Sequence, residues 1–132
     1  MKKQLTYKGK IIGGNKEGKQ FLSLEWVRKQ INRKLGFDPY LGTLNLLLLD
    51  GENNYELRKA KGTIIKPKMG YYEGKCFEAI VMDEIKTAVV LPLTPNYPPH
   101  LLELIAPINL RNTMGINDGD IIKVIVNLQN TK

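Results

Sequence analysis

At 132 residues, the chain is long enough for one domain that buries about two-thirds of the surface its unfolded form would expose. It is 42% hydrophobic and 25% charged, no apolar run approaches the roughly 20 residues of a membrane span, and the N-terminal MKKQLTYKGK supplies no continuous apolar region of a signal peptide. The net charge of +7 favours an anionic partner without distinguishing nucleic acid, a membrane surface and a small polyphosphate. We therefore expect one cytoplasmic domain over 1–132.

Seven short apolar segments are predicted as strands, because each is rich in Ile, Val, Leu or Thr and is bounded by Gly, Pro, Asn or Asp. They are residues 5–12, 43–49, 62–68, 75–83, 86–92, 102–106 and 120–127. One helix is predicted over 24–35, with Ser23 as its N-cap and Gly36 as its left-handed terminator. This order is not an alternating βαβ pattern, so we expect a mainly β fold, a small barrel with helical decorations.

The segment GGNKEGKQF, 13–21, partly fits a P-loop. Gly13, Gly18 and Lys19 match G-x-x-x-x-G-K, but Gln20 stands where Ser or Thr should hold magnesium. The predicted helix also begins about five residues too late, and no parallel sheet is expected, so the P-loop is rejected. Two interpretations stay open: a glycine-rich turn whose backbone N–H groups face an anion, and an ordinary hairpin.

Thr43 and Asn45 lie two residues apart at the start of a predicted strand, so both side chains face the same side. They offer neutral oxygen donors, which suffice for Mg²⁺ when a nucleotide supplies further oxygens. The alternative is that they pair with backbone groups at the strand end.

Glu103 lies among four apolar residues of LLELI, which is unusual for a carboxylate without a ligand or basic partner. Further along, INLRNTMG is predicted as a short helix or turn carrying Arg111, whose guanidinium suits phosphate recognition. Several aromatic side chains are able to stack on a planar ligand, but packing is their more frequent use, and the sequence selects none of them. They are Trp26, Tyr40, Tyr71, Tyr72 and Tyr97.

Four segments together carry a resemblance that no single one would. They are GGNKEGKQFLSL, LGFDPYLGTLNL, LLELIAPINLR and INDGDIIKV. In this order they resemble the archaeal CTP-dependent riboflavin kinases, small single-domain enzymes unrelated to the ATP-using riboflavin kinases, over about residues 8–127. The resemblance implies a six-stranded cradle-loop β-barrel with one longer helix and short helical decorations, one strand fewer than the seven counted above.

The resemblance also implies an activity. The γ-phosphoryl group of CTP would be transferred to the 5′-hydroxyl of riboflavin, giving FMN and CDP, with Mg²⁺ as the cofactor. The partners would be these nucleotides and flavins, with neither nucleic acid nor a membrane, and we expect a monomer.

By resemblance, Thr43 and Asn45 match the magnesium ligands. Glu103 matches a flavin-contacting position and is the candidate catalytic residue, which orients or deprotonates the ribityl hydroxyl. The nucleotide-binding candidates, of which the first six form a loop, are Gly14, Asn15, Lys16, Glu17, Gly18, Lys19, Ile108, Asn109, Leu110 and Arg111.

Two positions depart from the family pattern. Lys16 stands where the nucleotide loop often has glycine, which bears on close backbone approach there. The flavin-contacting threonine falls on Pro95, and Thr94, one place earlier, is its candidate substitute.

Two other functions remain as alternatives. A basic β-barrel would bind nucleic acid or regulate transcription through the helix face of Arg28, Lys29 and Arg33. A flavin-binding or storage module would hold the flavin without catalysis.

Overall fold

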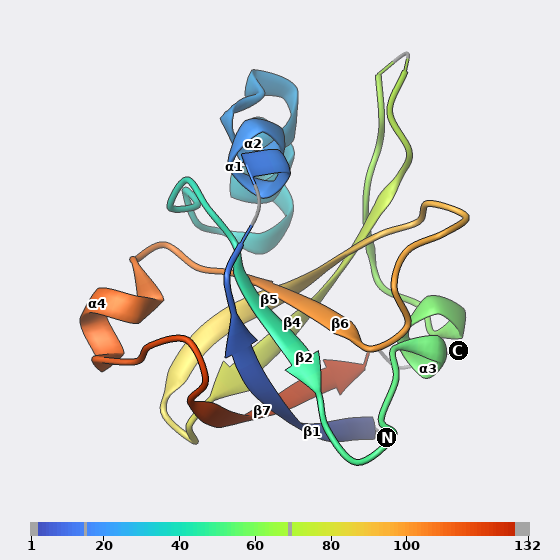
Figure 1. Cartoon of the computed structure of the whole chain (residues 1–132). Coiled ribbons are helices and arrows are strands. Elements are labelled where there is room, and N and C mark those ends of the chain that lie inside the picture. The colour runs from blue at the N-terminus through green and yellow to red at the C-terminus, as the bar shows by residue number, and fades with distance from the viewer. Residues whose placement is uncertain (1–2, 15, 69, 129–132) are drawn as a thin grey trace.

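A closed antiparallel β-barrel forms the centre of the computed structural model, which describes residues 3–14, 16–68 and 70–128 (Figure 1). The strands are β1 Lys3–Ile12, β2 Leu44–Leu48, β3 Thr63–Ile65, β4 Gly74–Val81, β5 Ile85–Pro92, β6 Leu101–Ile105 and β7 Ile121–Leu128. The helices are α1 Lys16–Ser23, α2 Glu25–Leu35, α3 Tyr55–Lys59 and α4 Leu110–Met114. All seven predicted strands are present, the segment 62–68 being shorter than expected.

Six of these strands make the barrel, in the order β4, β5, β6, β2, β1, β7, and pairing of β7 with β4 closes it. The seventh, β3, pairs only with the beginning of β4, where Thr63 lies opposite Cys76. The predicted barrel is therefore confirmed, and the additional strand in the sequence count is this short extension outside it. Closure leaves the barrel strands without open edges.

Side chains alternate between the two faces of each strand, and both faces of part of this barrel wall are buried. Leu46 and Leu102, directly opposite each other on β2 and β6, point into the barrel interior. The outer face carries a second apolar cluster, in which Val90 and Ile105 pack against the helical layer. A residue on the outer face of this wall can therefore be buried, without belonging to the barrel interior.

The helical layer consists of α1 and α2, above the barrel in Figure 1. Leu22, Val27 and Ile31 anchor the two helices in the outer cluster. The end of α2 is as predicted, because Gly36 has the left-handed φ of 84° and its N–H donates to the carbonyl of Asn32.

The predicted N-cap of this helix is wrong. The helix α2 begins at Glu25 after Leu24, and no side chain caps it. Ser23 is instead the last residue of α1, and its hydroxyl donates to the carbonyl of Gln20 over 2.7 Å. The turn or hairpin expected over 13–21 is therefore replaced from Lys16 onward by a helix, which places Leu22 in the outer cluster.

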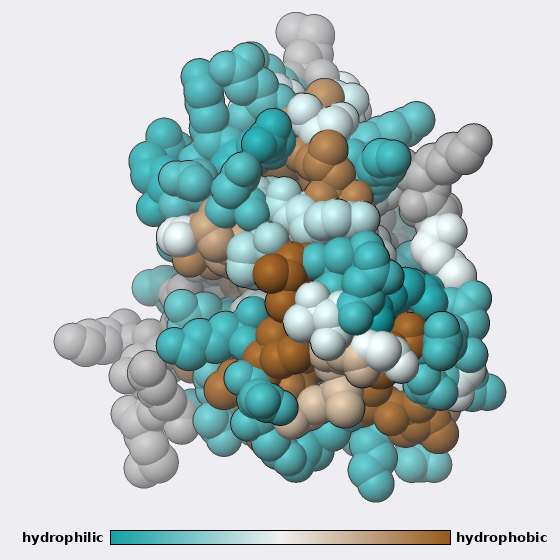
Figure 2. Space-filling view, turned by 90° about the vertical axis from the view of Figure 1, so that its left-hand side faces the viewer, coloured by the Kyte–Doolittle hydropathy of each residue, from teal (hydrophilic) through white to brown (hydrophobic). Residues whose placement is uncertain are grey.

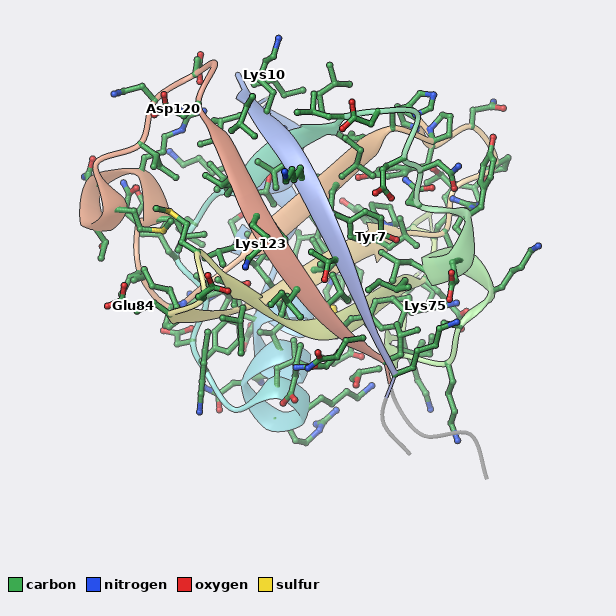
Figure 3. All side chains as sticks on the ribbon, turned by 90° about the horizontal axis from the view of Figure 1, so that it is seen from below. Tyr7, Lys10, Lys75, Glu84, Asp120 and Lys123 are labelled. Carbon is green, nitrogen blue, oxygen red and sulfur yellow. The ribbon has the colours of Figure 1, made fainter. Side chains whose placement is uncertain are left out.

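A buried lysine holds the short helix α3 against the barrel. The ammonium group of Lys75, on β4, donates to the carbonyls of Leu57, Arg58 and Ala60 over 3.2, 2.6 and 2.7 Å, at the end of α3 (Figure 3). These carbonyls lie where helices have no intrahelical donors, and a cation there also suits the helix dipole. Burial, and secondarily the charge of Arg58, lower the pKa of Lys75.

Replacing Lys75 with Met should cost about 2 kcal/mol of unfolding free energy, because three carbonyls lose a charged donor. The measurement is chemical denaturation followed by circular dichroism. Lys86→Met, an exposed position on the neighbouring strand β5, is the matched control and should change stability by less than about 0.5 kcal/mol. Equal unfolding midpoints for Lys75→Met and the unmodified chain would contradict this role.

Candidate active site

Three polar side chains meet on the outer face of the barrel wall. Asn45 on β2 lies directly opposite Glu103 on β6, and Thr43 precedes β2 on the same face. The hydroxyl of Thr43 is 2.8 Å from Oδ1 of Asn45 and 3.3 Å from Oε1 of Glu103. The prediction that Thr43 and Asn45 share a face is confirmed, and strand pairing adds Glu103, 58 positions beyond Asn45 in the sequence, to the same cluster.

The helix α1 covers this polar cluster at very close range. A Cβ atom on Gly18 would lie 2.6 Å from Oγ1 of Thr43, so only glycine permits this approach of the helix. A Cβ on Gly14 would lie 3.5 Å from Nδ2 of Asn45, an ordinary contact. The beginning of the segment 13–21 is thereby brought against the predicted metal ligands, and Asn45 is only 5% exposed.

A cavity of about 570 Å³ opens beside the cluster, which is within the usual range for small-molecule sites. Polar groups line it together with aromatic side chains from three parts of the chain. Its lining includes Thr43, Asn45, Thr94, Glu103, Phe21, Tyr71, Tyr72 and Tyr97. Of the two flavin candidates in the β5–β6 connection, Thr94 lines the cavity, whereas Pro95 is exposed and is not among the lining residues.

The connection between β3 and β4 forms another wall of this cavity and rises beside α1 and α2 in Figure 1. Tyr71 in this connection packs edge-on against Trp26 of α2, with 5.3 Å between ring centroids. Tyr71 and Tyr72 remain 49% and 57% exposed, which leaves ring surface for a planar ligand. Of the five aromatic candidates, Tyr71, Tyr72 and Tyr97 line the cavity, whereas Tyr40 lies elsewhere, beside Asn109.

Sequence reasoning considered Tyr97 only for stacking, but its hydroxyl donates to Oε2 of Glu103 over 2.5 Å. Burial, followed by the negative charge of Glu103 and this hydrogen bond, raises the pKa of Tyr97 well above 10. The phenol therefore stays protonated at neutral pH and remains a donor. The sequence feature that could have indicated this contact is the position of Tyr97, six residues before Glu103 in the connection that leads into β6.

The second predicted nucleotide segment lies at the start of α4 and contacts the end of β1, directly before the segment 13–21. Arg111 donates to the carbonyl of Ile12 over 3.2 Å and pairs with Asp118 at 2.6 Å. Asn109 caps α4 by accepting from the N–H of Asn112. Leu110 packs in the barrel core, so its side chain is turned away from any surface ligand, while Ile108 is 38% exposed.

The conformation expected for the first nucleotide segment is wrong. Residues Lys16–Ser23 form α1, so Gly18 and Lys19 lie inside a helix, and of the predicted loop 14–19 the described residue before the helix is Gly14. Asn15 lies outside the described residues, as do the side chains of Lys16 and Glu17. The helix begins earlier than the argument against a P-loop assumed, but an antiparallel barrel surrounds it, and that exclusion stands.

The basic face of α2 is partly neutralised. Arg28 pairs with Asp38 at 3.0 Å and Lys29 with Glu25 at 3.0 Å. These two ion pairs weaken the case for nucleic-acid binding at this helix.

Hydrophilic side chains cover much of the face shown in Figure 2, with hydrophobic ones in patches between them. Within residues 3–14, 16–68 and 70–128, no helix is long and apolar enough to cross a membrane.

The polar cluster suits a metal bound together with a ligand rather than a free metal. Within the part of the chain that the structure describes, no three His, Cys, Asp or Glu side chains are grouped to hold an ion. The Thr43 hydroxyl donates to Oδ1 of Asn45 over 2.8 Å, which places two neutral oxygen atoms side by side. Mg²⁺ prefers oxygen ligands and takes several from water and substrate phosphates, so the chemistry of these two groups fits Mg²⁺ bound together with a nucleotide.

Comparisons with known proteins place the chain in one group. Residues 11–126 match the family model CTP-dep_RFKase, described as "Domain of unknown function DUF120". The chain is 38% identical to a riboflavin kinase of Ignicoccus hospitalis, covering 94% of this chain and 72% of that protein. It is 39% identical to one of Archaeoglobus fulgidus (92% and 54%) and 35% identical to one of Sulfurisphaera tokodaii (96% and 98%). The chain thus spans about half of one relative and nearly all of another.

Gly18→Ala should destabilise the protein by about 1 kcal/mol, although alanine favours a helix interior, because the added methyl group overlaps Thr43. Thermal unfolding measures this, and a crystal structure of the variant should show the contact between Thr43 and Asn45 lengthened. Gly13→Ala is the control, since its Cβ would meet nothing closer than 3.8 Å. A higher melting temperature for Gly18→Ala would contradict the close packing.

Proposed function

The chain belongs to the archaeal riboflavin kinase family, and from this premise we propose that it transfers the γ-phosphoryl group of CTP to the 5′-hydroxyl of riboflavin, giving FMN and CDP. The observation that carries the proposal is the position of Thr43, Asn45 and Glu103, between the glycine segment and an aromatic-lined cavity. One end of this arrangement suits a polyphosphate and the other a planar flavin.

On the donor side, we assign CTP to the segment 14–19 together with residues 108–111. The two segments are linked, because Arg111 bonds to the carbonyl of Ile12, two residues before Gly14. The first N–H groups of α1 lack intrahelical acceptors, which favours a phosphate at the start of this helix. Lys19 is exposed and adds positive charge.

Mg²⁺ is the proposed cofactor, with Thr43 and Asn45 as its protein ligands and the phosphates and water as the others. Bound there, it would offset negative charge on the phosphate oxygens. The neutral ligand pair makes metal binding dependent on the nucleotide, since two neutral oxygens alone hold a divalent cation poorly.

On the acceptor side, the flavin rings fit the cavity against Phe21, Tyr71 and Tyr72, and Thr94 is the proposed polar contact in place of Pro95. Glu103 then accepts a hydrogen bond from the ribityl 5′-hydroxyl. Because Oε1 of Glu103 is 3.3 Å from Oγ1 of Thr43, a hydroxyl held there lies next to the metal and phosphate site. Phosphoryl transfer depends largely on such alignment, and Glu103 supplies it whether or not it also takes the proton.

The first test is chromatography of the flavins after incubation of the protein with riboflavin, Mg²⁺ and either CTP or ATP. We expect FMN with CTP and little with ATP. FMN formed from ATP alone would contradict the assigned donor. A chain that binds riboflavin but makes no FMN with either nucleotide would support the storage alternative instead.

The second test removes both metal ligands. Thr43→Ala with Asn45→Ala should lower turnover at least 100-fold while the circular dichroism spectrum is retained, because phosphate charge is no longer offset. A matched pair, Thr6→Ala with Asn32→Ala, alters the same residue types at exposed positions of β1 and α2 and should keep its activity. Near-normal FMN production by the first pair would refute the metal-ligand assignment.

A further inference from the structure

We propose that Tyr97 is a positioning residue that acts through Glu103, and that α3 holds Tyr97 in place for this role; the inference rests on the proposed function. The hydroxyl of Tyr97 binds Oε2 of Glu103 at 2.5 Å, while Oε1 faces Thr43. A glutamate side chain has three rotatable bonds, and contacts at both oxygens restrict them. The carboxylate is thereby held with one oxygen toward Thr43 and the other toward Tyr97.

The connection between β5 and β6, which carries Tyr97, is tied to α3 and its N-terminal cap. Nδ2 of Asn54 donates to the carbonyls of Pro98 and Leu101 over 3.0 and 2.9 Å, and its backbone N–H donates to Pro99 over 2.9 Å. One turn further along, Nη2 of Arg58 donates to the carbonyl of Thr94 over 3.1 Å. Bonds on both sides of Tyr97 therefore fix the backbone that sets its direction.

This anchoring extends to the barrel wall. Asn54 is fully buried, and Lys75 of β4 holds the carbonyls at the end of α3. The connection therefore packs against α3, which is itself fixed to the barrel. Tyr97 itself packs against the barrel core, and its raised pKa keeps the hydroxyl a donor throughout the neutral range.

The consequence is a specific division of roles. The flavin rings contact other parts of the cavity, so loss of the Tyr97 hydroxyl should leave riboflavin binding largely intact. Glu103 would then sample several rotamers, and fewer bound complexes would have the 5′-hydroxyl aligned with the phosphate. The loss should therefore be seen in kcat and not in KM.

A double-mutant cycle tests this inference, using Tyr97→Phe, Glu103→Gln and both together. Phenylalanine keeps the packed ring and removes only the hydroxyl. We expect Tyr97→Phe to lower kcat at least 10-fold, the size of one hydrogen bond to a charged group, with KM for riboflavin changed less than threefold. In the Glu103→Gln background, the same substitution should lower kcat less than threefold.

Two further measurements complete the design. Quenching of riboflavin fluorescence gives the dissociation constant without turnover, and it should be within threefold of the unmodified chain for Tyr97→Phe. Tyr55→Phe removes an exposed hydroxyl from α3, outside the cavity, and should leave every parameter unchanged.

The outcomes separate this inference from the proposed function. If the unmodified chain makes no FMN with any nucleotide, both fall. If it is active and Tyr97→Phe retains its kcat, only the positioning role falls. That role also falls if the two substitutions lower kcat by independent factors, or if Tyr97→Phe weakens riboflavin binding as much as it lowers kcat.

Discussion

The candidate site depends on one constraint, that part of the barrel wall is buried on both faces. In most small barrels the outer positions of a strand meet water. Here α1 and α2 cover the outer face of β5 and β6, so a polar residue placed outward on β2 or β6 is enclosed. Asn45 and Glu103 lie at the edge of this cover, where the apolar cluster gives way to the cavity. The alternation of side chains along a strand thus supplies leucines to the barrel interior and polar side chains to the candidate site.

The distance between helix and wall is as important as the cover itself. The contact of Gly18 with Thr43 leaves no room for a side chain, so α1 lies directly against the polar cluster. A larger residue would move the helix outward or turn the Thr43 hydroxyl away from Asn45. Gly18 is therefore required by the packing of a helix and not by a left-handed turn. Its role is to let α1 approach Thr43 closely.

The sequence predicted the seven strands, the long helix with its Gly36 terminator, and the shared face of Thr43 and Asn45, because each rests on local patterns of alternation and turn residues. It could not predict α1, since the segment Lys16–Ser23, with a glycine and three charged residues, has little local preference, and burial of Leu22 decides its structure. Nor could it place Glu103 opposite Asn45, because register between distant strands is a tertiary property. The Tyr97 contact depends on that register as well.

Precision in this site comes from residues that lie away from the proposed chemistry. Lys75 of β4 binds the carbonyls at the end of α3 and fixes this helix. Asn54 and Arg58 hold the β5–β6 connection against it, and Tyr97 of that connection binds the carboxylate of Glu103. Each of these contacts is a hydrogen bond to a backbone carbonyl or to the carboxylate of Glu103. Removing one partner of such a buried bond costs more free energy than the bond contributes on average. Because Asn54 and Arg58 bind main-chain carbonyls of the connection, these bonds do not depend on an exposed side chain such as Pro95, whereas the Tyr97 side chain makes the contact with Glu103.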